Sequence, residues 1–168
     1  MAIHGAAAPG ERELRVEGQV AATPAAVWAV LGDVRRMPDL SPELVRMIGL
    51  KPGGLRRGQW YLGINRRGPV VWPTRSTVTD VEPGRLLAWD TATSGARWIW
   101  ELVPEGEGTL VVHRRPVPRR LTQLTRLFAA AFLGGASKHT EDLERDMAAS
   151  VARLKVAVEG GPDHRDGR

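Results

Sequence analysis

Three polar side chains in predicted strands could do chemistry. His113 is a candidate general acid or base, because an imidazole titrates near neutral pH. Asn65 and Arg75 could polarise a carbonyl group or move a proton. No carboxylate stands at an obvious position to orient the imidazole, because Asp90 could do so only if it faced inward and Glu101 is predicted to face outward. A structural or exposed histidine is therefore the alternative to a catalytic one.

The sequence has no motif for thiol, metal, serine-nucleophile or phosphate-binding chemistry. The chain has no cysteine, which excludes thiol nucleophiles and cysteine-ligated zinc. The four histidines, at 4, 113, 139 and 164, do not have the spacing of metal ligands. A nucleophile-elbow GxSxG is absent, and the glycine pairs do not continue into a phosphate-binding GK[ST]. We therefore expect no metal and no cofactor.

The segment RWIWEL, residues 97–102, places two tryptophans two positions apart. Successive side chains on a strand point to opposite sides, so Trp98, Trp100 and Leu102 share one face of a predicted strand. Core packing could explain the pair. A ligand cavity is the preferred interpretation, because each indole N–H needs a partner that a dry core seldom offers.

Charge and length limit the class of protein. The chain has 168 residues, a formal net charge of +5 and a pI of about 10.6, which suits one domain with its own core. Its arginine doublets are spread along the chain among acidic residues and accompany no nucleic-acid-binding motif, so we expect no specific nucleic-acid partner. Without a signal peptide or an apolar run of membrane-spanning length, the sequence predicts a cytoplasmic protein.

Two short helices and a series of strands are predicted before residue 116. Residues 14–20 alternate as a strand, and Thr23 and Pro24 then begin a short helix. The proline-rich 37–44 allows at most a second helical turn or two. Further strands, joined by glycine-containing turns, indicate an antiparallel meander. They are VRMIGL, GQWYLGI, VVWPTRSTVTDV, RLLAWDTA, ARWIWELV and TLVVHRR.

The last third is predicted to be helical. Residues 119–133 form a basic amphipathic pattern, interpreted as a helix packed on the domain's own core. The alternatives are a lid over a cavity and a weak peripheral contact with an anionic membrane. A longer helix over 137–158 carries one apolar stripe. The stripe consists of Leu143, Met147, Val151, Leu154 and Val158.

These elements predict an α+β fold. A twisted antiparallel sheet of about seven strands must cover its apolar face, and the long C-terminal helix is the element expected to cover it. The face that carries Trp98 should therefore point towards this helix. We expect a disordered tail at 1–11, one domain at 12–159 and a second disordered tail at 160–168.

The order of elements and several local phrases resemble the START-like (SRPBCC) superfamily, in particular its polyketide cyclase/dehydrase-like branch. The matching phrases are VAATPAAVWAVLGDVRRMPDLSPEL, LRRGQWYLGINRRGPVVW, STVTDVEPGRLLAW, ARWIWELVPEGEGTLVVHRR and DLERDMAASVARLKVAVE. The resemblance implies the helix-grip fold, in which a curved sheet wraps around the C-terminal helix and a cavity between them holds an apolar ligand.

Carried over by position, the resemblance places a set of strand residues on the cavity side, and the stripe of the long helix faces them. Strand alternation independently groups Trp98 with Trp100, Tyr61 with Asn65, and Val111 with His113. The predicted ligand-binding set is Tyr61, Asn65, Trp72, Trp89, Trp98, Trp100, Val111, His113, Met147 and Val151.

Three functions remain open from the sequence. The preferred one is binding of a small hydrophobic or polycyclic molecule, lipid-like or polyketide-like, between the sheet and the C-terminal helix. The second is a cyclase/dehydratase that uses the same cavity to hold a poly-β-keto chain in register. The third is a protein-interaction module with a vestigial cavity, whose arginine-rich loops dock an acidic partner.

Overall fold

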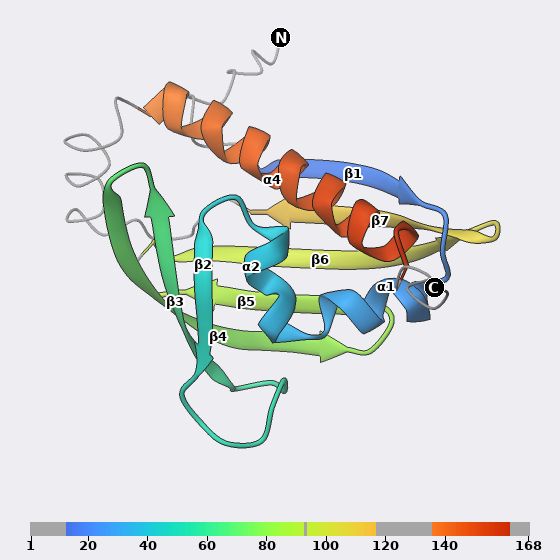
Figure 1. Ribbon diagram of the computed structural model, residues 1–168, viewed down its shortest axis with the longest axis horizontal. Helices are drawn as coiled ribbons and strands as arrows, with labels where there is room; N and C mark the ends of the chain where they lie inside the picture. The colour runs from blue at the N-terminus through green and yellow to red at the C-terminus, as the bar shows by residue number, and fades with distance from the viewer. Residues whose placement is uncertain (1–12, 93, 117–135, 162–168) are drawn as a thin grey trace, which may run out of the picture.

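The structure is a computed structural model that describes residues 13–92, 94–116 and 136–161 (Figure 1). Its strands are β1 (Leu14–Val20), β2 (Leu44–Gly49), β3 (Trp60–Arg67), β4 (Val70–Glu82), β5 (Leu86–Thr91), β6 (Ala96–Glu105) and β7 (Gly108–Arg115). Its helices are α1 (Pro24–Leu31), the 3-10 turn η1 (Val34–Arg36), α2 (Met37–Leu40) and α4 (Ala136–Glu159). The helix predicted at 119–133, the tail at 1–11 and most of the tail at 160–168 lie outside the described residues.

The seven strands form one antiparallel sheet in the order β1-β7-β6-β5-β4-β3-β2. Strands β2 to β7 follow one another as a meander, and β1 pairs with β7. Gly84 and Gly106 lie in the turns after β4 and β6 with φ of 74° and 59°, a conformation that side chains rarely adopt. The predicted strands and the antiparallel meander are confirmed, whereas the pairing of β1 with β7 was not predicted.

The first helix begins and ends at the residues that its sequence indicates. Thr23 Oγ1 accepts a hydrogen bond from the Ala26 amide at 3.3 Å, and Pro24 occupies the first turn. The Gly32 amide closes the last turn on the Trp28 carbonyl at 2.8 Å. The two short helices expected after the first strand are therefore present as α1 and α2.

Helix α4 packs most closely along β1 (Figure 1). A Cβ built on Gly18 of β1 would lie 2.5 Å from Cγ1 of Val151, so the glycine permits the close approach of helix and strand. The expectation that α4 alone covers the sheet is wrong. Helices α1 and α2 cover it as well, because they contribute Val27, Leu31 and Leu40 to the same buried core.

Candidate functional site

The register of the strands places the predicted strand residues on the concave face of the sheet. Asn65 pairs with Trp72, Trp89 with Trp98, and Trp100 with His113. Residues that pair across neighbouring strands lie on the same face. Val111 joins this face opposite Gly18, beneath α4, and Tyr61 joins it opposite Ser76.

The rings of Trp100 and His113 stack on each other in the middle of this face, and both side chains are buried. Their ring centroids are 3.8 Å apart and their planes differ by 15°. The exposed fractions of the two residues are 3% and 4%. Trp98 stacks on the same imidazole at 5.8 Å. The two tryptophans of RWIWEL therefore share one face, as predicted, and both contact the histidine.

Burial keeps His113 neutral. Its Nδ1 lies 3.0 Å from the Ile99 carbonyl, which can only accept, so Nδ1 carries the proton in this hydrogen bond. Desolvation lowers the pKa of the imidazole to about 4, although the bond to Ile99 opposes this shift. Near neutral pH the ring is therefore not protonated and has no proton on Nε2 to donate.

Two buried donors beside this stack have no hydrogen-bond partner in the structure. They are Nε1 of Trp100 and Nε of Arg115. Arg115 lies over the ring of Trp98, with its guanidinium carbon 5.4 Å from the ring centroid, and burial lowers the pKa of the guanidinium. An unpaired buried donor costs free energy, so this end of the concave face favours a group that accepts hydrogen bonds.

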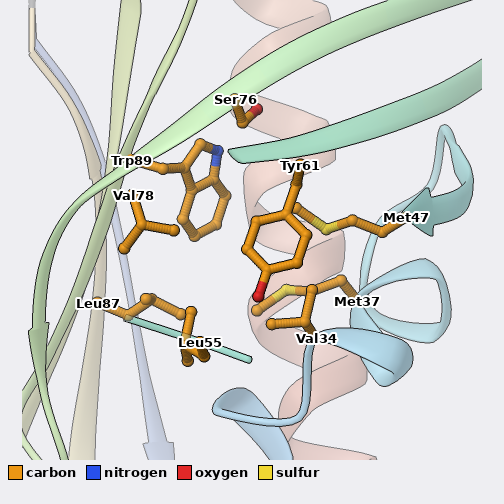
Figure 2. A pocket seen from close by; sticks show the side chains of 9 residues that line it. All are labelled: Val34, Met37, Met47, Leu55, Tyr61, Ser76, Val78, Leu87 and Trp89. Atoms are coloured by element: carbon orange, nitrogen blue, oxygen red, sulfur yellow. The ribbon is translucent and has the colours of Figure 1, made fainter. Parts of the chain in front are cut away.

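A small apolar pocket lies between the sheet, α2 and the loop after β2 (Figure 2). Figure 2 shows the Tyr61 ring crossing it towards Met37, with Trp89 opposite. The space open to the centre of a water-sized sphere is about 10 Å³, enough for roughly one water molecule. The lining consists of Val34, Met37, Met47, Leu55, Tyr61, Ser76, Val78, Leu87 and Trp89.

Most of the predicted ligand-binding set lies outside this pocket. Only Tyr61 and Trp89 line the pocket. Val111, Met147 and Val151 have exposed fractions of 0%, 1% and 4% and pack the sheet against α4 as core. Trp98 and Trp100 pair with the pocket-lining Trp89 and Leu87, and His113 stacks on both tryptophans. Asn65 and Trp72 pair with each other beyond the part of β4 that contacts β5.

Asn65 is held by its neighbours on β4. Its side-chain amide donates to the Thr74 hydroxyl at 3.0 Å and to the Trp72 carbonyl at 3.4 Å. These bonds fix the half-buried amide against the strand, and they occupy the donor that would polarise a substrate carbonyl. Trp72 is likewise half-buried on the concave face.

The structure corrects the assignment of Arg75. This residue lies on the convex face of β4, where its guanidinium carbon is 5.1 Å from the ring centroid of the exposed Trp60. It therefore cannot reach a ligand on the concave face. The two carboxylates considered as partners for His113 also face outward, because Asp90 pairs with Arg97 and Glu101 with Arg114.

Sequence analysis missed the α2 side of the pocket. Met37, Met47 and Leu55 come from a one-turn helix, an edge strand and a loop, which are too short to show a clear apolar period. The signal that could have identified them is the presence of methionines near a predicted turn, since methionine fills irregular spaces. Among the described residues, no group of three His, Cys, Asp or Glu could hold a metal ion.

Comparison with known proteins identifies the family of this chain. A family model described as "Polyketide cyclase / dehydrase and lipid transport" matches residues 11–159. No curated protein matches the chain. Within the described part of the chain, no helix combines the length and apolar character needed to cross a membrane.

Several solved structures share the fold. The Zhui aromatase/cyclase from Streptomyces sp. R1128 has a TM-score of 0.67 at 20% identity, covering 94% of this chain and 99% of that one. The di-domain aromatase/cyclase StfQ, from the steffimycin biosynthetic pathway, has a TM-score of 0.67 at 16% identity, covering 90% and 52%. A Polyketide_cyc-like protein from Corynebacterium glutamicum has a TM-score of 0.60 at 21% identity, covering 92% and 97%. With the helix-grip fold and the match over 11–159, this chain belongs to the polyketide cyclase/dehydrase and lipid transport family.

Proposed function

We propose that the protein binds a small apolar or polycyclic molecule, with at least one oxygen acceptor, on the concave face of the sheet. The observation that carries this proposal is the pair of buried, unpartnered donors, Trp100 Nε1 and Arg115 Nε. They lie among aromatic side chains, so a ligand oxygen would satisfy a donor while its rings contact the indoles. The family description, which names cyclase/dehydrase and lipid transport, supports a ligand of this class.

Binding requires the concave face to open. The pocket beside Tyr61 has room for about one water molecule, whereas ligand pockets usually hold several hundred Å³. Met37 and Met47 line it with flexible thioether side chains that can repack. Leu55 lies on the loop between β2 and β3, so the ligand would enter by displacing this loop side chain.

Mass spectrometry of small molecules that co-purify with the protein tests the proposal. The comparison is between the wild type and Leu55→Trp, which fills the pocket from the loop side. Val103→Trp, at an exposed position on the convex face of β6, is the matched control. We expect an apolar compound in the wild type and the control, and its loss in Leu55→Trp with the fold retained by circular dichroism. Equal retention in both variants, or no bound compound with no response to added polyaromatics, would count against binding at this site.

The family description also favours a second candidate, a cyclase/dehydratase that acts on a poly-β-keto chain. In that case neutral His113 would accept a proton, and Asn65 would have to release its hydrogen bonds to Thr74 and Trp72 in order to hold a carbonyl. Asn65→Ala and His113→Gln should then lower turnover while binding is retained. Unchanged product distribution in both variants would exclude this role for the two residues.

A further inference from the structure

The net positive charge is concentrated in one segment of the chain, because that segment lacks acidic residues. Residues 44–79 contain no Asp or Glu, and their formal charge of +7 exceeds the +5 of the whole chain. The expectation that basic residues alternate with acidic ones throughout is therefore wrong for this segment. The cations are Arg46, Lys51, Arg56, Arg57, Arg66, Arg67 and Arg75. The segment forms β2, β3 and most of β4, which is one end of the sheet (Figure 1).

The convex face of this end carries apolar side chains between the cations. The strand register places Ile48 opposite Leu62, and Leu62 opposite Arg75. Ile48 and Trp60 have exposed fractions of 37% and 38%, and Leu50 and Val71 have exposed fractions of 47% and 59%. We call this surface the convex patch. It consists of Arg46, Ile48, Leu50, Lys51, Trp60, Leu62, Ile64, Arg66, Val71 and Arg75.

Trp60 lies at the start of β3 in the convex patch, where two cations approach its ring. Lys51 Nζ is 4.1 Å from its ring centroid and the guanidinium carbon of Arg75 is 5.1 Å from it. Within the part of the chain that the structure describes, Arg67 alone of the seven cations forms ion pairs, with acids on the opposite side of the sheet. Among residues 13–92, 94–116 and 136–161, no acidic side chain therefore pairs with a cation of the convex patch.

We propose that the convex patch binds the surface of an anionic phospholipid bilayer. Cations interleaved with exposed aliphatic side chains and a tryptophan match such a surface, where phosphate and carboxylate groups lie above acyl chains. A nucleic acid offers phosphates but no apolar layer to receive Ile48, Leu50 and Val71. An acidic protein would match the charge but would have to cover these aliphatic side chains as well.

The convex patch adjoins the pocket through β2 and the loop that follows it. Met47 lines the pocket from the concave side, and its neighbour Ile48 is exposed on the convex side. The same loop carries Lys51 in the patch and Leu55 in the pocket. Contact with the bilayer would let an apolar ligand pass between the membrane and the concave face. This step rests on the proposed function.

Co-sedimentation with phospholipid vesicles tests the proposal. We expect the wild type to bind vesicles of phosphatidylserine and phosphatidylcholine, and to bind pure phosphatidylcholine much more weakly. Arg46→Gln/Arg75→Gln should lower the partition coefficient about tenfold or more, given the attraction of each cation to an anionic leaflet. Trp60→Ala should weaken binding without changing its salt dependence, because it removes an apolar contact rather than a charge.

A charge-matched variant controls for net charge. Arg15→Gln/Arg145→Gln removes two cations that pair with Glu17 and Asp142, away from the convex patch, and it should keep vesicle binding. An equal loss in both double variants, vesicle binding independent of phosphatidylserine, or binding to RNA without binding to vesicles would overturn the proposal. Co-purification of a small molecule is measured separately, so the convex patch and the proposed function can fail independently.

Discussion

At the residue scale, the stack of Trp100 and His113 explains how an ionisable group is accommodated in the core. The ring lies against an indole on one side, and its Nδ1–H is bonded to the Ile99 carbonyl. Such a position favours the neutral imidazole, because burial penalises the charge and no carboxylate faces it from the neighbouring strands. The same burial makes His113 a weak base rather than an acid at neutral pH.

The lowered pKa of His113 predicts a pH-dependent stability. The folded imidazole has a pKa of about 4 against 6.5 for a solvent-exposed histidine, so below pH 6.5 the unfolded chain binds a proton that the folded chain does not. This contribution to stability is complete above pH 6.5 and is lost as the pH falls towards 4, at up to about 1.4 kcal/mol per pH unit. Urea unfolding of the wild type and His113→Phe over this range measures it. The variant should lack this part of the slope, and identical slopes would show that His113 is not buried as described.

At the element scale, the contact between α4 and β1 depends on the absence of a side chain at Gly18. Gly18→Ala should destabilise the fold by roughly 1–3 kcal/mol, because its Cβ would lie 2.5 Å from Val151 Cγ1. The double variant Gly18→Ala/Val151→Ala removes the clash and should lose less stability than the sum of the single variants. Denaturant unfolding of the four proteins gives the coupling energy. Additive losses would mean that the helix does not pack at this glycine.

The loop between β2 and β3 depends on the buried side chain of Gln59. Its amide donates to the Lys51 carbonyl at 2.7 Å and the Gly54 carbonyl at 3.1 Å, and its Oε1 accepts from the Trp60 amide. Gln59→Leu should cost about 1–3 kcal/mol by leaving these groups unpaired. Amide hydrogen exchange should accelerate over 51–58. Unchanged exchange there would show that the loop is held by other contacts.

At the scale of the whole molecule, local patterns in the sequence predict the fold well. Strand alternation and glycine turns locate every strand, and the cap at Thr23 locates α1, because these signals act within a few residues. The alternation of side chains along a strand also predicts that Arg75 faces away from the concave side. This residue lies three positions from Trp72, so the two must face opposite sides of a regular strand. The pocket could not be predicted in this way, because Met37, Met47 and Leu55 meet only when the sheet curves around the helices.

The size of the pocket depends on the packing of the whole sheet against α1, α2 and α4. Sequence identifies the aromatic residues of the concave face, but their side-chain conformations decide whether a space remains between them. In the structure Trp100 and His113 close the middle of the face, and Tyr61 and Trp89 leave room for about one water molecule. The proposed binding of a ligand would therefore change the environment of several of these side chains together.

The most direct test of the central claim is to record the indole N–H signals of the six tryptophans by NMR while 1-naphthol is added. This uncharged probe has aromatic rings and an oxygen acceptor but no charge to attract it to the cations of the convex patch, so Trp60 on the convex face is the internal reference. Binding on the concave face predicts saturable shifts of Trp89, Trp98 and Trp100, with Trp60 unchanged. Shifts confined to Trp60, or no saturable shift of the concave-face indoles, would contradict the claim that the concave face is the binding site.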